Sequence, residues 1–127
     1  MVQSECRDLI LQYIAAYNCF DVDAMLALMT EDVNFRNISG GQVTATASGK
    51  AELRKLAEQT AKLFHEREQQ VIGIEFRGNA AIASIKYRGL LASDITGLAV
   101  AGTWLELQGL SEFIFSGARI ASLVDRS

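Results

Sequence analysis

The spacing of apolar residues changes about halfway along the chain, and this change restricts the folds that the chain can adopt. Before residue 64, most apolar residues recur every three or four positions, which predicts helices. From Gln69 onward they alternate with polar residues, as in strands with one buried face. No linker, repeat or low-complexity segment divides the 127 residues. We therefore expect one domain, residues 1–127, of the α+β class.

Three helices are expected in the first half. The first spans residues 4–20, and its inner stripe carries two phenols, Tyr13 and Tyr17. The second begins at Asp21, a good N-cap residue, and ends near residue 30. The third begins at Ser48, as its cap, and continues to residue 64. His65 then lies near the end of this helix, off the inner stripe, where an imidazole commonly donates a hydrogen bond to the last backbone carbonyls.

Two short strands are expected between the second and third helices. Residues 33–38 alternate, so that Val33, Phe35 and Asn37 share one face. A second strand covers residues 43–47. An amide on a face with Val33 and Phe35 must find hydrogen-bond partners, either in a ligand or within the protein.

The second half is expected to be a mainly antiparallel sheet. A two-residue turn at Gly78-Asn79 predicts a hairpin. A long strand over residues 103–115 and a final strand from residue 119 to about residue 125 complete the sheet. The apolar face of the hairpin contains Ile72, Ile74, Phe76, Ala81, Ala83, Ile85 and Tyr87.

Composition and charge narrow the classes of partner. Half of the residues are apolar, yet no uncharged apolar run approaches the ~18 residues of a membrane span. A net charge of −3 without a basic stripe argues against a nucleic-acid partner. Glu5 and Asp8 stand where a signal peptide would have a basic flank and an apolar stretch. We therefore expect a cytoplasmic protein that contacts neither nucleic acid nor membrane.

Motifs for metals and cofactors are not found. One histidine and two cysteines, Cys6 and Cys19, give no metal-ligand spacing. The two cysteines lie about 20 Å apart on the first helix, too far for a disulfide within it, and are expected to be reduced and buried. The segment "TATASGKA" lacks the first glycine and the final Ser or Thr of a phosphate loop. We expect no cofactor.

Three segments resemble the nuclear transport factor 2-like superfamily, and within it the SnoaL-like and ketosteroid isomerase-like branches. They are "YIAAYNCFDVDAMLALMTEDVNF", "SGKAELRKL" and "LELQGLSEFIFSGARIASLVD". The resemblance implies a cone-shaped fold in which three N-terminal helices pack on a highly curved, mainly antiparallel sheet around a pocket. It does not fix an activity, because one fold hosts many chemistries.

The resemblance to ketosteroid isomerases implies roles for three positions. In those enzymes a tyrosine of the first helix and a protonated aspartate form the oxyanion hole, and a second aspartate shuttles the proton. The tyrosine corresponds to Tyr13, the shuttling aspartate to Asn37 and the protonated aspartate to Ser111. An amide cannot act as a general base, so we do not expect a true ketosteroid isomerase.

The SnoaL-like resemblance points to a different carboxylate. These cyclases often end in a glycine, a basic residue, an isoleucine and, five residues after the isoleucine, an aspartate. The run "ARIASLVD" places Asp125 at this acid–base position and Ala118 where glycine is usual. The histidine that partners the aspartate in the cyclases has no counterpart, because the only histidine is His65.

The orientation of Asp125 depends on the last hairpin. A two-residue turn would point Asp125 outward, whereas a three-residue turn at residues 116–118 sets it opposite Gly109 and points it inward. We expect the three-residue turn, because it buries Leu123 with Phe113. Desolvation in an apolar cavity would then raise the pKa of the Asp125 carboxyl group.

These residues predict a protein that binds a small, largely hydrophobic molecule in its pocket. If it is an enzyme, we expect cofactor-free acid–base chemistry such as cyclisation, isomerisation or dehydration. A non-catalytic ligand-binding or dimerisation module and a protein-binding adaptor are the alternatives. Candidate catalytic residues are Asp125 and Tyr13, and candidate ligand contacts are Tyr17, Phe35, Asn37, Tyr87, Ser111, Phe113 and Leu123.

A homodimer is expected through the outer face of the sheet. Trp104, Leu110 and Ile114 alternate there with polar residues, and an apolar patch with a charged rim is typical of an interface.

Overall fold

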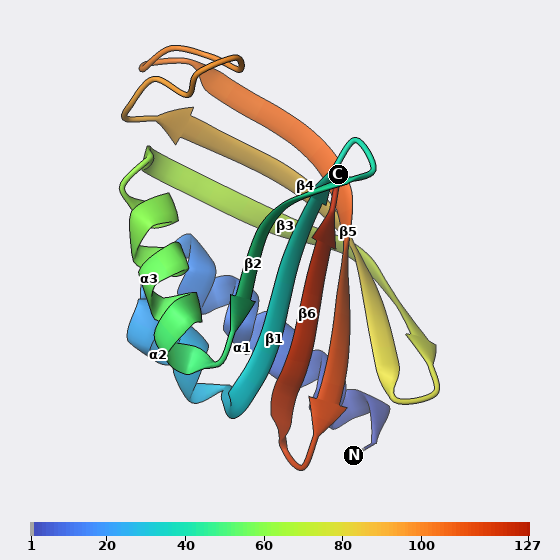
Figure 1. Cartoon of the computed structure of the whole chain (residues 1–127). Coiled ribbons are helices and arrows are strands. Elements are labelled where there is room, and N and C mark those ends of the chain that lie inside the picture. The colour runs from blue at the N-terminus through green and yellow to red at the C-terminus, as the bar shows by residue number, and fades with distance from the viewer. Residues whose placement is uncertain (1) are drawn as a thin grey trace.

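Three helices pack against one face of a strongly bent sheet in the computed structural model, which describes residues 2–127 (Figure 1). The predicted α+β class is therefore confirmed. None of these helices is long and apolar enough to cross a membrane. The helices are α1 (Gln3–Asn18), α2 (Val22–Ala27) and α3 (Lys50–Ala61). The strands are β1 (Met29–Ser39), β2 (Gln42–Ser48), β3 (Phe64–Arg77), β4 (Ala80–Leu91), β5 (Trp104–Ser116) and β6 (Arg119–Arg126).

The strands of the described chain form one sheet in the order β2-β1-β6-β5-β4-β3. Neighbouring strands are antiparallel except β1 and β6, which run parallel. The pairing of β1 with β6 joins an early strand to the last one. The helices lie on the inner side of the bend, and the C-terminus lies beside the β1–β2 hairpin (Figure 1).

A hydrophobic core fills the space between α1 and the sheet. The buried stripe of α1 has the predicted spacing, and the Tyr13 ring packs edge-on against Phe113 of β5 at a centroid distance of 5.8 Å. Each large apolar side chain that is fully buried contributes roughly 1.5–3 kcal/mol to stability. The largest of them are Phe113, Ile10, Met29, Leu91, Ile120, Leu123 and Val33.

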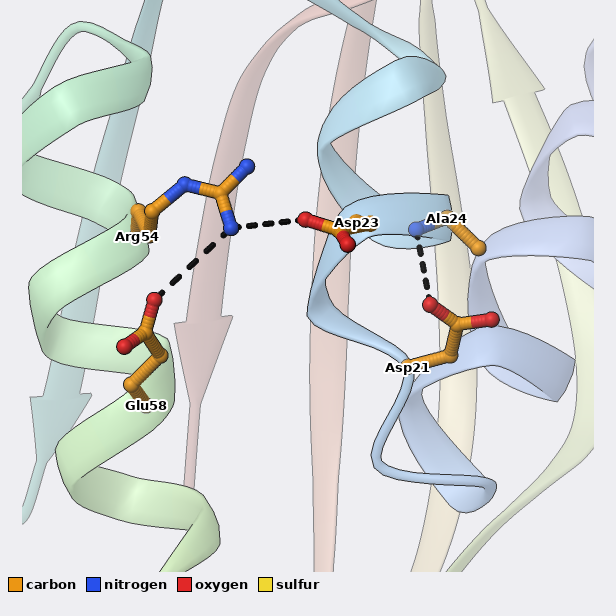
Figure 2. Close-up of polar contacts among 5 residues, drawn as sticks. All are labelled: Asp21, Asp23, Ala24, Arg54 and Glu58. Carbon is orange, nitrogen blue, oxygen red and sulfur yellow. Dashed lines mark hydrogen bonds and ion pairs between the residues drawn. The ribbon is translucent and has the colours of Figure 1, made fainter.

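Helix α2 begins as the sequence predicts. The Asp21 carboxylate accepts a hydrogen bond from the Ala24 N–H at 3.0 Å and so caps the helix (Figure 2). Arg54 of α3 reaches across to Asp23 at 2.7 Å and also contacts Glu58 at 3.7 Å. These pairs are exposed to solvent, so each contributes little to stability.

Both ends of α3 differ from the prediction. Its N-cap is Gly49, whose φ of +85° turns the chain out of β2, and Ser48 remains in that strand. The helix ends at Ala61, and β3 already begins at Phe64 because this residue pairs with the end of β4. His65 is therefore an exposed strand residue and not a helix cap.

The cysteines are both free, as predicted, but only one is buried. Cys6 lies on the packed stripe of α1. Cys19 is exposed, because it forms the C-cap of α1 beyond that stripe.

The β3–β4 hairpin has the predicted turn but a bulge changes its faces. Gly78 and Asn79 form the two-residue turn, and the predicted register holds as far as Gly73. Ile72 then bulges out and is 62% exposed, so its predicted place on the inner face is wrong. Beyond the bulge the inward side chains are those of Val71, Gln69 and Arg67, of which the last two are buried.

In the β5–β6 hairpin Asp125 has the predicted orientation, but the turn and the register differ from the prediction. Its turn has two residues, Gly117 and Ala118, and an extra residue, Ala121, then shifts the register. Because the bulge compensates for the shorter turn, Asp125 shares a face with Ser111 as predicted. The predicted partner is wrong: Asp125 lies opposite Ser111 and not opposite Gly109.

Candidate functional site

Three polar side chains form a row across the middle of the sheet. Asn37 of β1 pairs with Asp125 of β6, and Asp125 pairs with Ser111 of β5. Alanines flank the row, Ala45 on β2 and Ala83 on β4. Ser111 and Asp125 belong to one hairpin, and the parallel pairing of β1 with β6 brings Asn37, which is far away in the sequence, beside them.

Asp125 is the titratable group of this row. Ser111 Oγ donates a hydrogen bond to Asp125 Oδ1 at 2.7 Å. Burial raises the pKa of Asp125 from its ordinary value of 3.8 to about 6, and the Ser111 hydrogen bond limits the rise because it favours the carboxylate. The predicted inward orientation and the predicted direction of the pKa shift are thus both confirmed.

Two cavities meet at this row. The inner cavity, of about 240 Å³, lies between the helices and strands β1 and β2. The outer cavity, of about 160 Å³, lies near the end of β6. Tyr17, Asn37 and Asp125 line both. The inner cavity is also lined by Tyr13, Met25, Phe35, Ala45, Leu53, Leu56, Ala57, Thr60 and Arg67.

Three tyrosines supply neutral phenols to the site. Burial raises the pKa of Tyr13 well above its ordinary value, and the charge of Asp125 raises it further. Burial likewise raises the pKa of Tyr17 and Tyr87, whose hydroxyls are joined by a 3.2 Å hydrogen bond. All three therefore stay protonated. The Tyr17 hydroxyl donates its proton to the Tyr87 oxygen, which leaves the hydroxyls of Tyr13 and Tyr87 able to donate a hydrogen bond to a ligand. Tyr13 lines the inner cavity and Tyr87 the outer one.

Asn37 forms hydrogen bonds within the protein and also lines both cavities, so the two alternatives left open by its sequence context both apply. Its amide nitrogen donates to Thr44 Oγ1 at 2.8 Å and to Ser39 Oγ at 3.3 Å, which ties β1 to the β2 hairpin. Its Oδ1 accepts no hydrogen bond from residues 2–127. The amide thus has a structural role, and its carbonyl oxygen remains free for a ligand in either cavity.

The remaining candidates divide between cavity and core. Phe35 lines the inner cavity and Ser111 the outer one. Phe113 and Leu123 line neither, and both are fully buried. They pair with each other in the row next to that of Ser111 and Asp125, where side chains pack against α1. Their predicted contacts with a ligand are therefore wrong.

Sequence patterns missed two buried polar residues of the site. Arg67 is 5% exposed and lines the inner cavity; Gln69 is 9% exposed and lines the outer one. Strand alternation extended back from Ile74 would turn both side chains outward, and the bulge at Ile72 reverses this. Gly73, a glycine inside a strand, was the one available signal of a bulge.

Residues 2–127 contain no group of three or more His, Cys, Asp or Glu side chains arranged to hold a metal ion. The polar groups that line the two cavities are instead hydroxyls, amides, the Asp125 carboxylate, the buried guanidinium of Arg67 and, at the outer cavity, the exposed residues Arg126 and Ser127.

Comparison with known proteins gives a family and a fold. A family model described as a SnoaL-like domain matches residues 10–123. No curated protein sequence matches the chain.

Solved structures resemble this one over most of its length. A putative polyketide cyclase from Xanthomonas campestris has a TM-score of 0.84 at 20% identity and covers 98% of this chain and 91% of its own. A putative polyketide cyclase from Pseudomonas putida has a TM-score of 0.72 at 27% identity, with coverages of 92% and 86%. A Catenulispora acidiphila protein with a ketosteroid isomerase-like fold, in complex with trimethylamine, has a TM-score of 0.75 at 16% identity, with coverages of 92% and 82%. The predicted nuclear transport factor 2-like fold is thereby confirmed.

Proposed function

The chain belongs to the SnoaL-like domain family, and from this premise we propose that it binds a small, largely hydrophobic molecule and catalyses a cofactor-free, acid–base ring closure on it. The observation that carries the proposal is Asp125, a carboxyl group with a pKa near 6 at the boundary of two cavities. A general base works best when its pKa lies near the working pH. Two solved structures of the same fold are described as putative polyketide cyclases, which supports this reaction class.

The volumes of the two cavities support a ligand that extends through both of them and lies against Asp125. Pockets for small molecules usually measure roughly 300–1,000 Å³. Neither the inner cavity, about 240 Å³, nor the outer cavity, about 160 Å³, reaches this range alone. A ligand of ordinary size would therefore occupy both and lie against Asp125, Asn37 and Tyr17.

The chemistry would use two residues in complementary roles. The Asp125 carboxylate removes a proton from a carbon next to a ligand carbonyl, and the neutral Tyr13 phenol donates a hydrogen bond to the enolate oxygen. The enolate carbon attacks a second carbonyl carbon of the same molecule and forms the ring bond. The new alkoxide then takes the proton back from Asp125, so the product is an isomer of the substrate.

A simple ketone tests the first step without knowledge of the natural substrate. We expect the protein to accelerate exchange of the acidic hydrogens of 2-tetralone for solvent deuterium, measured by proton NMR in D₂O. The rate should rise as Asp125 ionises, with a midpoint near its pKa of about 6. Asp125→Asn should lower the catalysed rate by roughly 100-fold or more, because an amide cannot accept the proton.

The controls separate catalysis from binding alone. Asp32→Asn, at an exposed position outside both cavities, should keep the wild-type rate. If 2-tetralone binds without faster exchange, the protein is a ligand-binding module, the alternative that Asn37 and Ser111 favour because they stand where isomerases have carboxylates. Equal rates for wild type and Asp125→Asn would remove Asp125 from the mechanism.

A further inference from the structure

Arg67 is a buried cation that forms no ion pair within the described chain. Its guanidinium belongs to none of the ion pairs within residues 2–127, and its side chain borders the inner cavity. Burying a charge without a counter-charge is costly, so some group must compensate for it. The ligand of the inner cavity is the group that could do so.

Aromatic rings and a backbone carbonyl hold the guanidinium in place. Its carbon lies 3.7 Å from the centroid of the Tyr17 ring and 4.5 Å from that of Phe20. Its Nε donates to the Tyr17 carbonyl oxygen at 3.0 Å. Stacking on aromatic rings supplies part of the compensation and fixes the plane of the group before any ligand arrives.

The backbone at Phe20 is strained in a way that serves this arrangement. Phe20 has a φ of +59° at the end of α1, where helices usually place glycine. Its N–H donates to the Tyr17 carbonyl, and the Asp21 N–H donates to the Ala16 carbonyl, which is the normal pattern of a helix end. A bulky residue in this conformation is rare and costs energy. Here it places an aromatic ring beside Arg67.

The two terminal nitrogens of Arg67 remain without partners. Nη2 is enclosed and makes no hydrogen bond within residues 2–127, and Nη1 makes none either. Capping of the α1 C-terminus by Arg67 would explain the Nε contact and a favourable charge at that helix end. It does not explain why both terminal nitrogens are left unpaired in a residue that lines a cavity.

We propose that Arg67 binds an acidic oxygen of the ligand, so that the inner cavity selects a hydrophobic molecule that bears a carboxylate or an ionised enol. Guanidinium binds such planar anions through two parallel hydrogen bonds. This inference rests on the proposed ligand-binding function of the cavity. It adds a specificity-determining residue on β3, whose guanidinium lies against the end of α1, whereas Asp125 lies on β6.

The test compares two probes of nearly equal shape, 2-naphthoate and its neutral amide, 2-naphthamide. Calorimetric titration at pH 7 should give the carboxylate an affinity at least about ten-fold higher than the amide, because the hydrogen bonds to Arg67 are then charge-assisted. Arg67→Met should reduce this ratio to near one. In Asp125→Asn the ratio should persist or increase, because a nearby negative charge has been removed.

Arg88 provides a matched control, since its guanidinium also lies over an aromatic ring, 4.3 Å from the centroid of Trp104, but outside both cavities. Arg88→Met should keep the wild-type ratio. Where Arg67→Met does not fold, Arg67→Lys keeps the charge without the planar fork and should lower the ratio only in part.

Three results would overturn the inference. Equal affinity of wild type for the two probes would refute it and leave ligand binding intact. An equal loss of affinity for both probes in Arg67→Met would reduce Arg67 to a structural residue. Failure of both probes to bind at millimolar concentration would refute the inference together with the ligand-binding part of the proposed function, whereas the deuterium-exchange assay tests Asp125 separately.

Discussion

Asp125 shows how the site depends on a single residue that is costly for the fold. Its carboxyl group is half-buried beside one hydroxyl donor, Ser111, and no cation pairs with it within the described chain. Burial therefore favours the protonated form, which is why the pKa lies near 6. A carboxyl group in these surroundings is more useful as an acid or base than as a stabilising charge.

Asp125→Asn should stabilise the protein at pH 8. Because the folded-state pKa is raised, protonated Asp125 contributes stability that is complete below 3.8 and is lost as the pH rises through about 6. The amide keeps an acceptor for Ser111 without the charge, so the variant should gain up to about 3 kcal/mol at pH 8 and little at pH 4. Urea denaturation at both pH values measures the difference. A variant less stable than wild type at pH 8 would contradict this account.

At the scale of elements, two bulges decide which side chains reach the site. The bulge at Ile72 turns Arg67 and Gln69 of β3 inward, and the extra residue Ala121 in β6 keeps Asp125 inward after a two-residue turn. The end of β6 also runs close to β5 at Gly109. The position of Asp125 therefore depends on how closely β5 and β6 approach.

Gly109→Ala should destabilise the hairpin that carries Asp125. A Cβ at this position would overlap with the carbonyl oxygen of Arg126, a backbone atom that cannot rotate away. We expect a loss of about 1–3 kcal/mol in the free energy of unfolding, typical of overpacking. Gly73→Ala is the matched control in β3, because a Cβ there meets nothing within 4 Å, and it should be neutral or slightly stabilising. Similar losses in both variants would argue against the close approach.

At the scale of the whole molecule, the helices leave the outer face of the sheet uncovered. Trp104 and Leu110 of β5 are 43% and 44% exposed there. Glu106, Gln108 and Glu112 share the strand and rim the apolar residues. An apolar patch with a polar rim is a usual feature of protein interfaces.

We expect two copies of the chain to associate through this outer face. Light scattering at micromolar concentration should give twice the 13.9 kDa mass of one chain. Trp104→Glu should produce the monomer, since it replaces an exposed apolar side chain of the patch with a charge. Val43→Glu, at an exposed apolar residue of β2, should leave the dimer intact. A monomeric wild type would exclude this interface.

The sequence by itself determined the fold and most of the candidate site. Periodicity identified the three helices and the strands, because burial of one face leaves a local pattern of three to four residues or of two. The family resemblance pointed to Tyr13, Asn37, Ser111 and Asp125, and the structure places all four along the walls of the two cavities. These features depend on short-range patterns and on motifs that can be read along the chain.

Only the tertiary structure decided how these residues are surrounded. The bulges follow from pairing between strands, so the sequence of one strand does not specify them, and they alone bring Arg67 inward and set Asp125 beside Ser111. The same holds for Phe113 and Leu123, which are fully buried below the polar row because α1 covers them. A pKa near 6 and an unpaired guanidinium are properties of an enclosed space, and that space exists only when helices and sheet have packed together.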